Sequence, residues 1–210
     1  MIKISKRVLH AINLLSQGEY EFALQEAVIA IDVSAKKYYS SEKSSAKNYK
    51  NLLREYYWIL ELFGLNGVNL LQSSFSNLKV MDQGKIIANP NLFDIIYHIM
   101  RCHLVHNSGI PENMEFNYDR DLIIAKEFIS LPIGVIWGLL AIVVFSKINI
   151  EETSEGNAYF TYTQIDSVSE KWEVSTHWGK EEVLRRTYEQ YVKTRVNFQI
   201  SKFTEKNCVT

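Results

Sequence analysis

The stretch NLFDIIYHIMRCHLVHNSGIP, residues 91–111, carries clear signals for the start and the end of a helix. Asn91 is typical of a helix N-cap, and Gly109 with Pro111 is typical of a helix end. Apolar residues recur at helical spacing between them, so we predict a helix over residues 92–107 with one buried face. Within nine positions this helix also carries one arginine and three of the chain's five histidines: Arg101, His98, His103 and His106.

The sequence before this stretch predicts three further helices. Apolar residues recur at helical spacing in residues 6–16 and again in residues 19–39, and Gly18 between them predicts a short turn. The two segments therefore indicate an antiparallel helix hairpin. Another helix is expected over residues 46–64, where Gly64 ends it.

The sequence after the stretch predicts helices again. Residues 118–148 are expected to form one short helix and one long buried helix, separated by Pro132. The segment LPIGVIWGLLAIVVF, residues 131–145, could also be considered as a membrane span. It has fifteen residues, whereas a spanning helix needs roughly 20. We therefore predict a buried core helix there and no membrane contact.

The last 60 positions change in character. AYFTYTQI (residues 158–165) and KWEVSTHW (residues 171–178) alternate polar with aromatic or β-branched residues, which predicts a β-hairpin. Helical spacing returns in residues 179–195. We expect a mainly α fold, an antiparallel helical bundle over residues 1–150, with a small C-terminal β-hairpin and helix over residues 151–210 packed on it.

Composition limits the classes of function. The chain has 210 residues, a formal net charge of −1 and a pI of about 6.5, so it is not a globally basic nucleic-acid binder. A local basic patch remains possible. Two cysteines, Cys102 and Cys208, provide no disulfide framework, and no signal peptide is evident at the start of the sequence. A reducing cytoplasm is the expected compartment.

Arginine and histidine together suit the cleavage of RNA. The ribose 2′-hydroxyl can attack the adjacent phosphate, which requires a proton transfer and stabilisation of negative charge. Histidine titrates near neutral pH, and the planar guanidinium of arginine fits phosphate oxygens. The reaction needs no metal or other cofactor, and DNA lacks the attacking hydroxyl.

The spacing of the two residues bears on oligomeric state. His106 lies five positions after Arg101 along the chain, a step that corresponds to about 140° of rotation on an ideal helix. The two side chains would share one cleft if the last turn is distorted or if two copies of the helix meet. A homodimer with facing helices of residues 92–107 is therefore expected.

The sequence Arg101-Cys-His-Leu-Val-His106 resembles the motif of the HEPN superfamily, an arginine followed at short distance by a histidine near a helix end. The resemblance implies a HEPN-like helical fold and a metal-independent endoribonuclease of toxin–antitoxin, anti-phage or stress-defence type. It implies Arg101 and His106 as the catalytic pair, with His103 and Asn107 as accessory residues. The partners that it implies are RNA, a second copy of the chain, and an antitoxin or other partner protein. Cys102 differs from the polar residue, commonly asparagine, that follows the arginine in the family. The tyrosine that follows the histidine in members silenced by a nucleotidyltransferase antitoxin is also absent, since Asn107 and Ser108 follow His106 here.

Other interpretations remain open for the same residues. Arg101 could be a structural ion-pair partner, and His106 could cap the last helical turn. Cys102, His103 and His106 could be considered metal ligands, although a second ligand pair is missing. The chain could then be a non-catalytic helical module that binds RNA, a nucleotide or a partner protein.

One basic stripe bears on RNA binding. Four cations follow one another at spacings of four, three and four residues, which would place them on one helical face. Such a stripe could follow a phosphate backbone or could be a solvated helix face. Its residues are Lys43, Lys47, Lys50 and Arg54.

Overall fold

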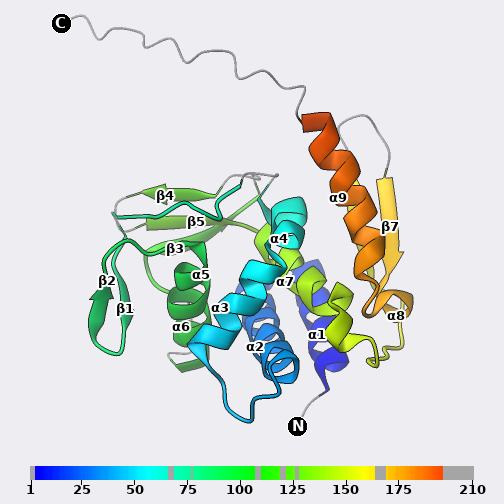
Figure 1. Ribbon diagram of the computed structural model, residues 1–210, viewed down its shortest axis with the longest axis horizontal. Helices are drawn as coiled ribbons and strands as arrows, with labels where there is room; N and C mark the ends of the chain where they lie inside the picture. The colour runs from blue at the N-terminus through cyan, green and yellow to red at the C-terminus, as the bar shows by residue number, and fades with distance from the viewer. Residues whose placement is uncertain are drawn as a thin grey trace, which may run out of the picture.

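The computed structural model describes residues 3–65, 69–76, 78–106, 110–118, 122–125, 128–163 and 169–195. Helices α1 (Ile4–Ser16) and α2 (Tyr20–Tyr38) form the predicted antiparallel hairpin at the centre of the molecule (Figure 1). Gly18 in the turn has a φ of +78°, a conformation that glycine adopts without strain. The apolar faces of both helices are buried, which confirms the periodicity read from the sequence.

The expected third helix is two helices. Helix α3 (Ala46–Glu55) ends at Tyr56, and α4 (Tyr57–Gly64) continues in a new direction. Each piece has its own buried face, because Leu52 and Leu53 are fully buried in α3 while Ile59 and Leu60 are fully buried in α4. The two pairs are seven positions apart, about two turns of an ideal helix, so the buried face that the sequence predicts is kept across the break at Tyr56.

Helix α7 (Gly134–Phe145) is the predicted core helix, and it is buried along nearly its whole length. It crosses α4 at very close range. A Cβ atom on Gly134 would lie 2.7 Å from the carbonyl oxygen of Phe63, and one on Gly138 would lie 2.8 Å from a methyl carbon of Leu60. No helix in the described residues has the length and apolar character that crossing a membrane requires.

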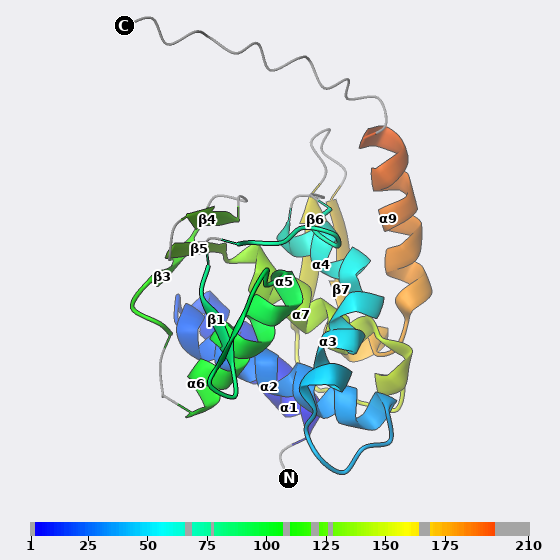
Figure 2. The same cartoon turned by 60° about the vertical axis from the view of Figure 1, so that its left-hand side comes forward.

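The prediction of a mainly α helical bundle is wrong, because three small sheets surround the helices (Figures 1 and 2). The segment before Pro132, expected to be a short helix, consists of strands. It includes Ile123, Ile124, Phe128 and Ile129, residue types that favour strands, and the strand that ends at Pro132 finds a parallel partner in Met114–Asn117, so strand pairing prevails over helix. The first sheet pairs β1 (Val80–Asp82) with β2 (Lys85–Ile87). The second has the strand order β3-β5-β4, in which β5 (Phe128–Pro132) lies between β3 (Met114–Asn117) and β4 (Ile123–Ala125). The third pairs β6 (Tyr159–Thr163) with β7 (Ser169–Glu173).

The C-terminal hairpin is at the opposite side of the molecule from the other two sheets (Figure 1). Strand β6 lies within its predicted segment, but β7 begins earlier than predicted and ends at Glu173. Val174–His177, expected to continue the second strand, form a helical turn instead. The turn between the strands falls outside the described residues. Phe160 and Trp172 pack against Phe145 of α7 and Phe63 of α4. The hairpin therefore shares the core of the helical body. The division of the chain at residue 150 stays a prediction.

Three further helices complete the described C-terminal part. A 3₁₀ helix, η2 (Lys147–Asn149), follows α7. Two α-helices, α8 (Val174–His177) and α9 (Glu181–Arg195), follow the hairpin. Helix α9 is fastened to α4, because the Arg185 guanidinium lies 4.6 Å from the centre of the Trp58 ring and the Tyr188 ring contacts the same indole.

Candidate functional site

The helix that carries the arginine and histidines begins at the predicted cap. The side chain of Asn91 accepts hydrogen bonds from the backbone N–H groups of Phe93 and Asp94, and the Asp94 carboxylate accepts one from the N–H of Asn91 in return. This reciprocal arrangement satisfies backbone donors that a helix start leaves free. The start of the helix was therefore readable from the sequence.

The path of the helix after its first turn was not readable from the sequence. It runs as α5 (Leu92–Asp94), then as a π-helix, η1 (Ile95–Arg101), and finally as α6 (Cys102–His106). The N–H of Cys102 bonds to the carbonyl of Tyr97, five residues back. Stretches of π-helix are rare and are found frequently at functional sites. Arg101 is the last residue of this one.

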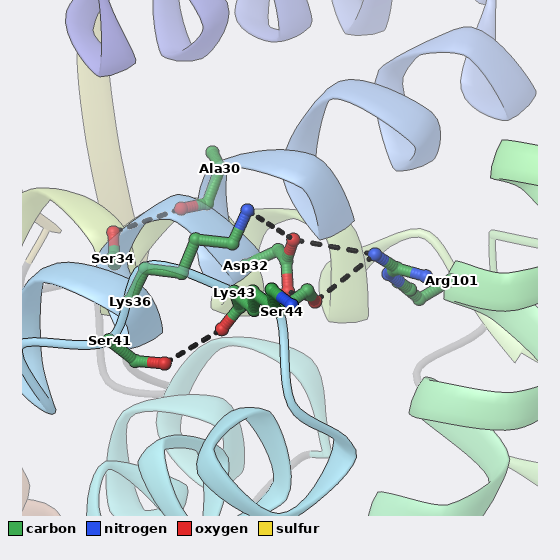
Figure 3. Close-up of polar contacts among 8 residues, drawn as sticks. All are labelled: Ala30, Asp32, Ser34, Lys36, Ser41, Lys43, Ser44 and Arg101. Atoms are coloured by element: carbon green, nitrogen blue, oxygen red, sulfur yellow. Dashed lines mark hydrogen bonds and ion pairs between the residues drawn. The ribbon is translucent and has the colours of Figure 1, made fainter.

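Arg101 is anchored by a carboxylate and a hydroxyl from a distant part of the chain. Its Nη2 lies 3.4 Å from Oδ2 of Asp32 on α2 and 3.2 Å from Oγ of Ser44 in the loop between α2 and α3. Ser44 in turn donates to the other oxygen of Asp32. Figure 3 shows Arg101 reaching from its own helix toward both residues. The guanidinium is therefore held at one terminal nitrogen.

The buried environment of this anchor affects its ionisation. Burial is the largest single influence and disfavours the charged form of Arg101, but Asp32, Tyr97 and Cys102 together outweigh it, so the pKa of Arg101 is raised above its ordinary value. Lys36, one turn after Asp32, lies 3.7 Å from the same carboxylate. Asp32 is thus surrounded by two cations and a hydroxyl, which compensates the burial of its charge.

Two donors in the same region are buried without a partner. The Nε of Arg101 and the hydroxyl of Tyr49 on α3 have no hydrogen-bond acceptor within the described residues. Tyr49 is fully buried, and burial raises the pKa of its hydroxyl well above the ordinary range. The Asp32 carboxylate also raises this pKa, and the Arg101 guanidinium lowers it. Unsatisfied buried donors are uncommon in proteins and mark places where a water or ligand oxygen is expected.

The remaining predicted site residues lie at the end of the helix. His106 is the last residue of α6, and only its backbone is described. Asn107 lies outside the described residues. His103 is half-buried. The structure thus positions Arg101 and brings the backbone of His106 to the helix end, while the pairing of their side chains stays a prediction.

His98, also on η1, lies beside Asp82 of the β1–β2 hairpin. Its Nδ1 lies 3.8 Å from Oδ1 of Asp82, and its Nε2 is buried without a partner among the described residues. Burial lowers the pKa of His98, although Asp82 and Asp94 act in the other direction. Lys50, which also lowers the pKa, is paired with Asp94 at 2.8 Å.

The basic stripe is not a single exposed face. Lys43 precedes α3, because the helix begins only at Ala46, so its place on a common helical face was wrongly predicted. Lys50 is engaged by Asp94, and the guanidinium of Arg54 lies 5.0 Å from the centre of the Phe93 ring. Lys47 is exposed on the first turn of α3.

Sequence reasoning missed the residues that hold Arg101. Asp32 lies within the apolar segment of α2, between Ile31 and Ala35, which are buried. A single carboxylate in such a stripe indicates a buried cationic partner, and this signal was available. Ser44 and Tyr49 carried no such signal.

The described residues contain no group of histidine, cysteine and carboxylate side chains able to hold a metal ion.

Comparison with known proteins gives one match. The family model named Rv1289 matches residues 3–204, nearly the whole chain. No curated protein and no solved structure matches the chain at a significant level.

Proposed function

We propose that this chain, which belongs to the Rv1289 family, is a metal-independent endoribonuclease in which Arg101 and His106 act on the scissile phosphate. The anchored guanidinium of Arg101 carries the proposal. Asp32 and Ser44 bind one terminal nitrogen, so the side chain is already oriented before a substrate arrives. Donors that are fixed in advance stabilise developing negative charge without reorganisation during the reaction.

The chemistry follows from the two residue types. His106, at the end of α6, would accept the proton of the ribose 2′-hydroxyl or donate one to the leaving 5′-oxygen. Arg101 would stabilise the charge on the pentavalent phosphate. The first product then ends in a 2′,3′-cyclic phosphate, because the nucleophile is the neighbouring hydroxyl. Lys47 and Arg54, exposed on α3, are candidates to contact the flanking phosphates.

The setting of this activity is part of the proposal. The helices of residues 92–107 from two copies would meet, so that each cleft contains the arginine and histidine of both protomers. We expect the protein to act in the cytoplasm, in a defence or stress role, restrained by an antitoxin or another partner protein.

One observation favours a second function. The charge of Arg101 is already compensated by Asp32, as in a structural ion pair. An arginine of this kind is compatible with a non-catalytic module that binds RNA, a nucleotide or a partner protein. The experiment below distinguishes the two functions.

The test is cleavage of single-stranded RNA in the presence of EDTA. We expect the wild type to cut RNA, to leave DNA of the same sequence intact and to produce cyclic phosphate ends, detected by mass spectrometry. His106→Ala should reduce the rate by roughly 10²-fold or more. Arg101→Lys should reduce it by about the same factor, because the planar fork is lost while the charge is kept.

The matched control is His10→Ala, since the His10 side chain on α1 is more than half exposed and lies outside the proposed site. It should cut like the wild type. RNA binding without cleavage by the wild type would support the non-catalytic function. Equal cleavage by all variants would place the activity elsewhere or in a contaminant.

A further inference from the structure

We propose that an acidic surface with exposed aromatic rings, formed by the start of α2 and by β3, binds an arginine-bearing segment of a partner protein. Tyr20 is the first residue of α2, Phe116 lies on β3, and Tyr118 directly follows that strand. Carboxylates stand next to these rings in both segments. The acidic aromatic surface consists of Glu19, Tyr20, Glu21, Glu112, Phe116 and Tyr118.

Direct contacts bring the two segments of this surface together. The Tyr20 hydroxyl donates a hydrogen bond to the Tyr118 hydroxyl at 3.0 Å, although the two residues are 98 positions apart. The centre of the Tyr20 ring lies 5.8 Å from that of Tyr118 and 5.9 Å from that of Phe116. Oε1 of Glu21 accepts a hydrogen bond at 3.0 Å from the N–H of Ile110, the fourth residue after His106. The rings and the carboxylates therefore belong to one surface.

Tyr118 is available to a partner. Its side chain is 80% exposed, the highest value among the exposed large hydrophobic residues that the structure describes. Its hydroxyl accepts the proton of Tyr20, so its own O–H can still donate to a carbonyl oxygen of another chain. A side chain with so little contact contributes little to packing, and replacing it should leave the fold intact.

The charge around the rings determines what kind of partner fits. Residues 17–23 and 110–118 contain four carboxylates and neither lysine nor arginine. Glu19 and Glu112 are exposed, and the Glu19 side chain makes no capping hydrogen bond at the start of α2. Negative charge of this kind repels the phosphates of a nucleic acid and attracts a cationic segment.

Arginine is the cation that uses both features of the surface. Its planar guanidinium can stack on a tyrosine ring and pair with a carboxylate at the same time, whereas the ammonium of lysine is a strongly hydrated point charge. The geometry therefore points to a partner segment that contains arginine. This inference does not depend on the proposed ribonuclease activity.

The experiment measures the binding of a defined probe to the full chain. A fluorescein-labelled peptide of alternating arginine and glycine is titrated with the protein, and binding is followed by fluorescence anisotropy. We expect saturable binding that is weakened about threefold when lysine replaces arginine in the peptide, because the planar group is lost while the charge is kept. A peptide with glutamate in place of arginine should not bind.

Variants of the surface test its residues. Tyr118→Ser should weaken binding of the arginine peptide about fourfold, the effect of one cation–π contact at an exposed site. Glu19→Gln should weaken it about twofold, the effect of one exposed ion pair. The matched controls, Ile150→Ser and Glu189→Gln, remove an exposed apolar side chain and an exposed carboxylate elsewhere, and both should bind like the wild type. Circular dichroism checks that all four variants are folded.

Three results would overturn the proposal. The first is the absence of saturable binding of the arginine peptide, or equal binding by the wild type and Tyr118→Ser. The second is binding of labelled oligouridine that Tyr118→Ser weakens while peptide binding is unchanged, which would assign the surface to RNA. The third is a lower sedimentation coefficient of Tyr118→Ser without peptide, which would assign it to a second copy of the chain. None of these measurements uses RNA cleavage, so a failure of the proposed function is distinguishable from a failure of this inference.

Discussion

Arg101 on η1 and Asp32 on α2 lie 69 positions apart in the sequence, yet Nη2 and Oδ2 are 3.4 Å from each other. Both side chains are largely shielded from water, with 14% and 9% of their surfaces exposed. The pair fastens the helix that ends at His106 to the central hairpin. Arg101 consequently has a structural role whatever its chemical role is, and the two must be separated experimentally.

Removal of the arginine alone should destabilise the protein. Arg101→Leu leaves Asp32 buried without its principal cation, which should lower the free energy of unfolding by about 3 kcal/mol. Urea denaturation followed by circular dichroism measures this change. The double variant Arg101→Leu with Asp32→Leu should recover much of the loss, because no uncompensated charge remains. A double variant less stable than the single would contradict this explanation.

Removal of the Tyr49 hydroxyl should stabilise the protein. Tyr49→Phe keeps the buried ring and removes a hydroxyl that has no acceptor in the described structure, so stability should rise by about 1 kcal/mol. Thermal denaturation under reducing conditions tests this. Tyr38→Phe is the matched control, since its hydroxyl donates to Glu55 at 2.7 Å, and its stability should not rise. A Tyr49→Phe protein that melts earlier would show that the hydroxyl has a partner.

Because of His98, the free energy of unfolding should decrease at mildly acidic pH. Burial lowers its pKa below about 6.5, so the unfolded chain binds the proton more readily than the folded protein. Stability should therefore fall as pH decreases below about 6.5. His98→Phe should flatten this dependence, and Asp82→Asn should steepen it, because Asp82 favours the protonated ring. Melting temperatures between about pH 5 and 7 would measure both effects.

The close crossing of α4 and α7 should tolerate no side chain at Gly134. The Cβ of Gly134→Ala would lie 2.7 Å from a backbone oxygen, which must shift. We expect a loss of about 1–3 kcal/mol, more than alanine gains from helix propensity. Gly138→Ala should cost less, because its closest contact is the flexible end of Leu60. The reverse order in urea denaturation would contradict the packing described.

The proposed dimer should depend on the uncovered side of α6. Helix η1 is covered by α2, α3 and the β1–β2 hairpin, so a facing copy must approach elsewhere. Val105 on α6 is 37% exposed. Val105→Lys should convert the dimer to a monomer in light scattering at micromolar concentration. Ile150→Lys, at a more exposed position beyond α7, should leave the dimer intact.

Local signals in the sequence were sufficient for several elements. Asn91 marked the start of its helix correctly, since a cap depends on residues a few positions away. The apolar run that ends at Phe145 correctly predicted the core helix, because a continuous apolar segment is also a local feature of the sequence. The strands before Pro132 were missed, because β5 is stabilised by β3, a partner that local periodicity does not show.

The site was predictable only in part for a related reason. Arg101 stood out by residue type and by its place in the helix. Its contacts with Asp32 and Ser44 depend on how α2, the following loop and η1 pack. The π-helix has no composition of its own, and it arises from hydrogen-bond register under tertiary packing.

That π-helix lets this helix hold one more residue than an α-helix of the same total rotation. A π-helical turn holds more residues than an α-helical turn, so a single insertion into an α-helix can create one and a single deletion can abolish it. Loss of one residue such as Ile99 would return the segment to α-helix and leave the residues after it in nearly the same orientation, because the wider turn is lost together with the residue. A change of one residue in chain length between Asp94 and Cys102 should accordingly be tolerated better than the same change inside α1 or α2, where it would rotate the rest of the helix by about 100°.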